Sequence, residues 1–90
     1  MRISSNGMLL GIVTKDAGVT KDGTAYEGYT ALHYVLEGEV QSRSYYVRKD
    51  DNEDLWRKLL SMDDTWGTPI YITGDIDFKG RVSVESVEGV

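Results

Sequence analysis

The chain has 90 residues, no cysteine and a formal net charge of −5. This length is that of one domain, covering residues 1–90, and the absence of cysteine excludes disulfides, thiolate metal sites and a cysteine nucleophile. Residues 1–49 carry six Lys/Arg against five Asp/Glu, whereas residues 50–90 carry four against ten. Such an acidic second half is a poor general surface for polyanions, although a locally basic face is compatible with it.

The same features indicate where the protein works. Small secreted domains usually depend on disulfides, and the first residues have no apolar signal core, so we expect a cytoplasmic protein. No apolar run approaches the length that crosses a membrane, and we expect no membrane partner. A domain of this size buries only a modest core, which favours a homo-oligomer, either a dimer or a tetramer.

Three strands are predicted in the first half of the chain. The first covers about 8–14, where Leu, Ile and Val are concentrated. A loop follows that contains Asp22-Gly23, a strong turn signal because both residues tolerate positive φ. The second strand covers about 26–36, and the third covers about 40–49 after a turn at Glu37-Gly38-Glu39.

A helix and two further strands are predicted in the second half. The polar stretch 50–54 supplies N-cap residues, and apolar residues follow at helical spacing, which predicts a helix over 52–62 that stops before Gly67. Strands are expected at 69–78, with Gly74 marking a bulge, and at 81–87. We assign Trp56 and Phe78 to the core.

The predicted order is β-β-β-α-β-β. It defines a mainly β fold and matches a five-stranded barrel of the oligonucleotide/oligosaccharide-binding (OB) type, with one helix between strands three and four. An SH3-like barrel and an open α+β sheet are the alternatives that the same elements allow.

Few residues point to catalysis. His33 is the only histidine, and no nucleophile elbow, zinc-ligand spacing or phosphate-binding glycine loop is present, so we predict no enzyme, no metal and no cofactor. The run Asp50-x-Asn52-x-Asp54 begins like a calcium loop but lacks its glycine and its final glutamate. Asp75 and Asp77 are expected on one strand face, where a solvated surface explains them more simply than a metal-dependent enzyme does.

The six tyrosines all fall in or beside predicted strands. Tyrosine on an exposed sheet can serve as a stacking platform for unpaired bases, and Arg43, Arg48 and Lys49 lie next to Tyr45 and Tyr46. Because neighbouring residues of a strand point to opposite faces, only one of these two tyrosines is expected to be exposed. Simple packing is the competing explanation, since tyrosine favours strands in general.

Two segments resemble known DNA-binding families. Residues 67–76, with the sequence Gly-Thr-Pro-Ile-Tyr-Ile-Thr-Gly-Asp-Ile, resemble the strand that follows the helix in bacterial single-stranded DNA-binding proteins. Residues 19–26, Val-Thr-Lys-Asp-Gly-Thr-Ala-Tyr, are more loosely similar to the turn and tyrosine of filamentous-phage single-stranded DNA-binding proteins. The resemblance implies an OB barrel in which Tyr26 stacks on bases and Lys21 contacts phosphate.

We therefore predict sequence-tolerant binding of single-stranded DNA, with RNA as an open alternative ligand, in support of replication or recombination in a phage, plasmid or bacterial system. The predicted contact residues are Lys21, Tyr26, Tyr34, Arg43, Tyr45, Tyr46, Arg48 and Lys49. The alternative is an OB- or SH3-like module for protein–protein interaction or assembly that uses the acidic second half. The first prediction requires the aromatic and basic residues of strands two and three to be exposed on one face.

Overall fold

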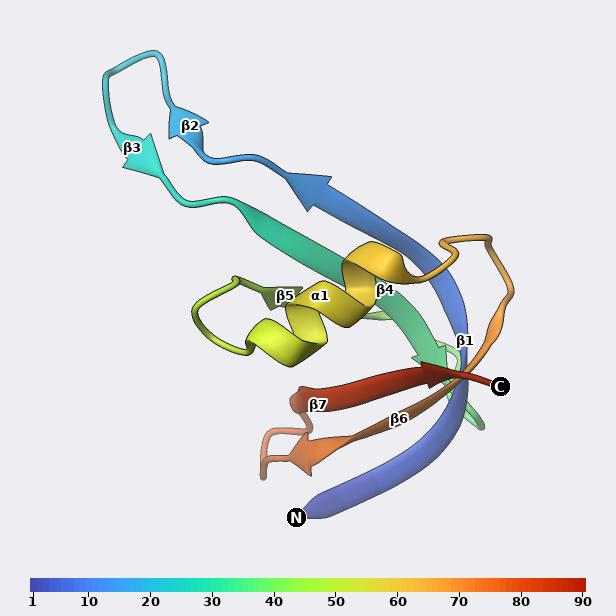
Figure 1. Ribbon diagram of the computed structural model, residues 1–90. Coiled ribbons are helices and arrows are strands. Elements are labelled where there is room, and N and C mark those ends of the chain that lie inside the picture. The colour runs from blue at the N-terminus through green and yellow to red at the C-terminus, as the bar shows by residue number, and fades with distance from the viewer.

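The computed structural model describes residues 1–90 as a curled antiparallel sheet of five strands with one helix and a separate hairpin (Figure 1). In sheet order the strands are β5 (Arg43–Val47), β4 (Tyr29–Leu36), β1 (Arg2–Lys15), β6 (Pro69–Ile76) and β7 (Val82–Gly89). The hairpin consists of β2 (Gly18–Val19) and β3 (Ala25–Tyr26), and α1 (Glu53–Ser61) lies between β5 and β6 in the chain. Because β5 and β7 remain the two edges, the sheet is a half-barrel.

β1 is the strand that curls the sheet. Its first half pairs with β6 and its second half pairs with β4, and the two pairings overlap at Gly7 and Met8. A side chain at Gly7 would place its Cβ 2.6 Å from the carbonyl oxygen of Val35, so the close crossing of β1 and β4 requires glycine here. The register shifts between Leu9 and Gly11, and such an irregularity bends a strand.

The predicted start of this strand at residue 8 was wrong, because β1 begins at Arg2. Residues 4–7 are Ser, Ser, Asn and Gly, which lack the apolar pattern that indicates a strand. Their extended conformation comes instead from hydrogen-bonded pairing with β6. The other strands differ from their predicted ranges at the ends: the predicted strand 26–36 is divided into β3 and β4, and β5 is shorter than 40–49.

α1 covers the concave side of the sheet. Asn52 caps the helix by accepting a hydrogen bond from the backbone N–H of Leu55 (3.1 Å), and Leu55 and Leu59 are buried. The predicted helix at 52–62 is therefore confirmed to within one residue at each end. The buried core comprises Leu9, Leu32, Tyr34, Leu36, Val47, Leu55, Leu59, Ile70, Ile72, Val84 and Val87. No helix of the chain combines the length and apolar character needed to cross a membrane.

Trp56 and Phe78, the two aromatic residues assigned to the core, differ in their burial. Trp56 is half-buried and packs against the core cluster. Phe78 is 94% exposed, and its assignment to the core was wrong. The reason is that β6 ends at Ile76, so Phe78 lies in the turn to β7 and no longer follows the alternation of the strand.

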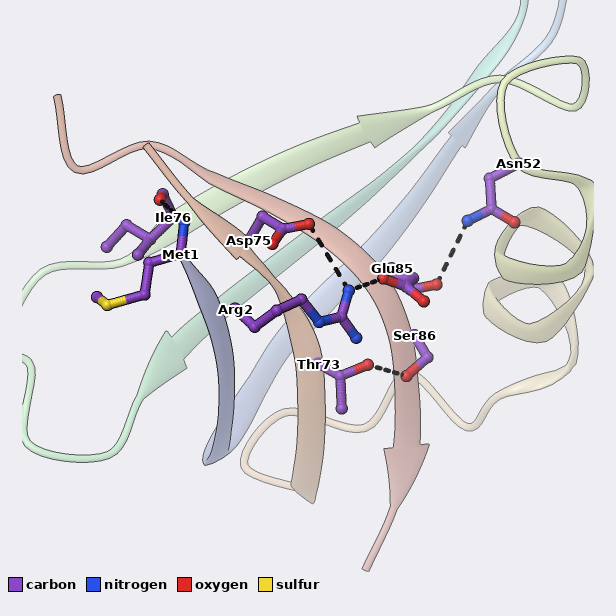
Figure 2. Close-up of polar contacts among 8 residues, drawn as sticks. All are labelled: Met1, Arg2, Asn52, Thr73, Asp75, Ile76, Glu85 and Ser86. Carbon is purple, nitrogen blue, oxygen red and sulfur yellow. Dashed lines mark hydrogen bonds and ion pairs between the residues drawn. The ribbon is translucent and has the colours of Figure 1, made fainter. Parts of the chain in front are cut away.

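Side-chain contacts join β1, β6, β7 and the start of α1. Figure 2 shows the guanidinium of Arg2 between the carboxylates of Asp75 and Glu85, and the hydroxyls of Thr73 and Ser86 hydrogen-bonded across β6 and β7. Asn52 donates a hydrogen bond to the backbone carbonyl of Glu85 (3.3 Å). The predicted bulge at Gly74 is confirmed by a register shift between Thr73 and Gly74.

Asp75 and Asp77 do not form a shared carboxylate face. Asp75 belongs to β6 and lies 3.6 Å from Arg2. Asp77 lies in the following turn, where its carboxylate accepts hydrogen bonds from the backbone N–H groups of Lys79 and Arg81 (2.9 Å each). These bonds lower the pKa of Asp77. Nowhere in the chain do three or more His, Cys, Asp or Glu side chains gather as a metal site would require.

Candidate functional site

The outer face of the sheet is the side of β1, β4 and β5 that points away from α1 and the core. In β5, Val47 is buried and Tyr45 packs against the core, so Tyr46 points outward and is 62% exposed. The prediction that only one of these two tyrosines is exposed is confirmed. Ser44, two residues before Tyr46, also points outward. Its hydroxyl is hydrogen-bonded to the Nδ1 atom of His33 on β4 at 2.7 Å.

Tyr46 has an aromatic partner on the neighbouring strand. The ring centroids of Tyr29 and Tyr46 are 5.2 Å apart and the rings are inclined at 52°, a tilted arrangement that aromatic pairs favour. Tyr29 begins β4 and faces Lys15 of β1 in the antiparallel register. The register therefore brings an aromatic pair and a lysine to one end of the outer face.

Two hollows lie at this end of β1 and β4, and Tyr29 lines both; the first is on the outer face, whereas the second includes Trp56 of α1 and so opens toward the helix side. The first hollow, about 300 Å³, is lined by Tyr29, Tyr46, Arg48 and Asp51. The second hollow, about 260 Å³, is lined by Thr14, Lys15, Asp16, Ala17, Gly28, Tyr29, Lys49 and Trp56. Three aromatic residues and three cations thus line the two depressions, which share Tyr29.

Each cation of the two hollows has a partner within the protein. The Nζ atom of Lys49 lies 5.7 Å from the ring centroid of Trp56, and the Nζ atom of Lys15 lies 4.9 Å from that of Tyr26. Arg48 forms an ion pair with Glu27 at 3.2 Å. Because Asp16 and Asp51 also line the hollows, the positive charge of the site is largely balanced by nearby carboxylates.

The hairpin of β2 and β3 forms an arm, residues 16–28, that projects beyond the sheet (Figure 1). Residues Asp16, Ala17 and Gly28 at its base line the second hollow. Its turn forms at Asp22-Gly23 as predicted, with Gly23 at a φ of 89°. The carboxylate of Asp22 accepts hydrogen bonds from the hydroxyl of Thr20 and the N–H of Thr24, which lowers the pKa of Asp22. Exposed Lys21 lies in this turn, at the tip of the arm.

Tyr26 lies along the arm and helps to hold its two strands together. It pairs with Gly18, where an added Cβ would lie 2.6 Å from the Tyr26 hydroxyl oxygen. The ring therefore occupies the space that the glycine leaves, and Lys15 lies over it. Tyr26 is partly exposed, but part of its ring is already used within the arm.

The structure places three of the eight predicted contact residues at the two hollows and two on the arm, where Lys21 lies at the far tip. Tyr46, Arg48 and Lys49 line the two hollows, and Tyr26 and Lys21 lie on the adjoining arm. The other three predicted contact residues alternate with the outward-pointing ones along β4 and β5, so they face the core side of the sheet. They are Tyr34, Tyr45 and Arg43.

Tyr34 is removed from the candidate site by its burial. Only 1% of this residue is exposed, because it lies on the concave side of β4 among the core residues. Burial raises the pKa of its hydroxyl. A ring enclosed in this way offers no face on which a base could stack, so its assignment as a contact residue was wrong. Tyr45, half-buried against the core, offers little more.

Arg43 has a structural role in place of the predicted phosphate contact. Its guanidinium donates two hydrogen bonds of 2.7 Å to the carboxylate of Glu39 and one of 2.8 Å to the carbonyl of Gly80. The bonds to Glu39 lower the pKa of that carboxyl. Arg43 therefore fixes the turn between β6 and β7 to β5, and few of its donors remain for a ligand.

Sequence reasoning missed three residues of the site, namely Lys15, Tyr29 and Trp56. Lys15 and Tyr29 come together only through the register of β1 and β4. Trp56 was assigned to the core, yet it also lines the second hollow. The sequence indicated only that Tyr29 belongs to the predicted strand 26–36; the break that makes it the first residue of β4 was not foreseen.

Comparison of the chain with protein-family models, with curated proteins and with solved structures finds no significant match. The function must therefore be argued from the geometry of the site.

Proposed function

We propose that this chain is a non-enzymatic protein that binds single-stranded DNA without sequence preference. The observation that carries the proposal is the aromatic pair of Tyr29 and Tyr46 on the outer face, beside Arg48. Stacking of a base on an aromatic side chain contributes about 1–3 kcal/mol and tolerates every base, since each base has a π-face. A guanidinium beside such a pair is suited to contact the connecting phosphate.

The strand order supports an OB-type fold for this protein. In that fold, oligonucleotides lie on the second and third strands, between the loop that joins strands one and two and the loop that joins strands four and five. Here β4 and β5 are the second and third strands of the sheet in chain order, and the arm joins β1 to β4. The turn that joins β6 to β7 carries the exposed Phe78, with the Nζ atom of Lys79 at 5.7 Å from its ring centroid.

We propose that the strand passes Tyr29 at this end of the sheet. One base would lie against the exposed side of the Tyr29–Tyr46 pair on the outer face, and the next would enter the second hollow toward Trp56. The phosphates would then lie near Arg48, Lys49 and Lys15, which surround the same depressions. Since one barrel of this kind covers about 4–16 nucleotides, we further propose that the protein acts as a homo-oligomer in replication or recombination.

The proposal is tested by titrating a fluorescein-labelled oligo(dT) of about thirty nucleotides, long enough for more than one barrel, and recording fluorescence anisotropy. We expect binding at low salt. About three phosphate contacts imply that binding weakens roughly 20-fold between about 50 and 200 mM salt. A duplex of the same length should bind more weakly, because its bases are not free to stack. Absence of binding to oligo(dT) at low salt would contradict the proposal.

A second function is favoured by a different feature. Leu60 and Trp66 are exposed near the C-terminal end of α1, beside a hollow of about 280 Å³ lined by Ile12, Thr14, Leu59, Leu60, Met62 and Asp64. An exposed apolar patch with a polar rim is typical of protein-binding surfaces. A protein–protein interaction module would therefore use this end of the helix, and failure of the DNA titration would favour it.

A further inference from the structure

Arg48 is the only cation that lines the first hollow, and it is already paired. Its Nε atom lies 3.2 Å from the Oε2 atom of Glu27, which is the last residue of the arm before Gly28. A carboxylate beside a guanidinium offsets the positive charge, and faces the Nε side, that a phosphate would otherwise meet. In the free protein, Arg48 is thus paired with the carboxylate of Glu27 at the position where the proposed function requires a DNA phosphate.

The position of Glu27 follows from the path of the chain. At Gly28 an added Cβ would lie 2.8 Å from the carbonyl oxygen of Lys15 and 2.9 Å from the N atom of Ala17. Glycine therefore allows the second strand of the arm to pass directly against the first as the chain enters β4. This close crossing fixes the backbone next to Glu27 and so places its carboxylate at the end of β5, where Arg48 follows Val47.

The ion pair is weak enough to be exchanged. The side chains of Arg48 and Glu27 are 57% and 75% exposed, and pairs this open to solvent typically contribute about 0–1 kcal/mol to stability. A DNA phosphate that is also held by stacking on Tyr29 and Tyr46 can therefore displace the carboxylate. The exchange would release the arm from its only ion pair with the body of the domain.

We propose that Glu27 is an internal competitor of the DNA backbone: it occupies Arg48 in the free protein and a phosphate replaces it on binding. The inference rests on the proposed function, since it names the residue that regulates the same site. It predicts that removing the charge of Glu27 strengthens DNA binding and that this gain requires Arg48.

A matched control separates this effect from a simple change in net charge. Arg57 and Glu53 form a similar exposed ion pair on α1, at 2.6 Å, and neither residue lines the two hollows. Glu27→Gln and Glu53→Gln therefore change the total charge equally, but only the first removes a carboxylate that is ion-paired with a cation of the hollows; Glu53 reaches Lys49 only through a weaker through-space attraction.

The experiment titrates labelled oligo(dT) with the wild type, Glu27→Gln, Glu53→Gln, Arg48→Ala and the double variant Glu27→Gln/Arg48→Ala. Loss of a competing pair of this strength should make Glu27→Gln bind about 2- to 5-fold more tightly, with a clearly smaller change for Glu53→Gln. In the Arg48→Ala background the Glu27→Gln gain should disappear. Thermal melts of each variant verify that the exposed substitutions leave the fold intact.

Three results would overturn the inference: equal gains for Glu27→Gln and Glu53→Gln, a gain that persists without Arg48, or weaker binding by Glu27→Gln. The last result would mean that the ion pair assists binding by holding the arm. Failure of the proposed function is distinguishable, because then neither the wild type nor Glu27→Gln binds oligo(dT) at low salt.

Discussion

Replacement of Tyr34 by alanine is expected to destabilise the fold by about 3–5 kcal/mol, because it empties an aromatic site in the core. Tyr34 is only 1% exposed and contacts the main apolar cluster. Domains of this size are stable by about 5–15 kcal/mol in total, so the variant should be partly unfolded at ambient temperature or close to it. Urea and thermal unfolding followed by circular dichroism measure the effect.

Tyr46→Ala is the matched control for this prediction. It removes the same atoms from the next strand, but its ring lies on the outer face and is 62% exposed. We expect its stability to change by less than about 1 kcal/mol, with DNA affinity as the property that falls. If Tyr34→Ala kept the wild-type stability and lost only DNA binding, the assignment of Tyr34 to the core would be contradicted.

Replacement of Tyr29 by alanine should give the largest loss of DNA affinity among single changes at the site. Tyr29 lines both hollows and contacts Tyr46, so its removal takes away an aromatic surface that both hollows share. Loss of about 1–3 kcal/mol of stacking corresponds to roughly 5- to 150-fold weaker binding. The anisotropy titration measures the change, and Tyr29→Phe should retain most of the affinity.

Tyr71→Ala provides the comparison for Tyr29. Tyr71 is 39% exposed on β6 and lines neither hollow. Its replacement should leave the affinity for oligo(dT) within about 2-fold of the wild type, since surface changes remote from a site have small effects. Equal losses for the Tyr29 and Tyr71 variants would show that the bases lie elsewhere.

The sequence patterns that predicted the fold correctly are local. The helix was recognisable because Asn52 is a capping residue and Leu55 and Leu59 follow at helical spacing. The bulge was recognisable from a glycine inside an apolar strand. The first residues of β1 were missed because their extension is imposed by a partner strand, and Phe78 was misplaced because alternation does not reveal where a strand ends.

The site was predictable only in part, because part of it also depends on contacts between segments that lie apart in the sequence. Alternation within β5 correctly separated Tyr46 from Tyr45. It could not show that Tyr34 faces the core, since the inward side of β4 is decided by where α1 packs. Nor could it join Lys15 to Tyr29, because cross-strand register is a property of two segments that lie apart in the sequence.

The most direct test of the proposed interface uses the intrinsic fluorescence of its tryptophan. The chain has two tryptophans: Trp56 lines the second hollow, and Trp66, 70% exposed, lines neither hollow. The variant Trp66→Phe leaves Trp56 as the sole reporter, and Trp56→Phe leaves Trp66. Titration with unlabelled oligo(dT) should quench Trp56 strongly, with a salt dependence that follows the anisotropy data, and should leave Trp66 unchanged. Binding that quenches only Trp66, or that leaves Trp56 unaffected, would contradict an interface at the base of the arm.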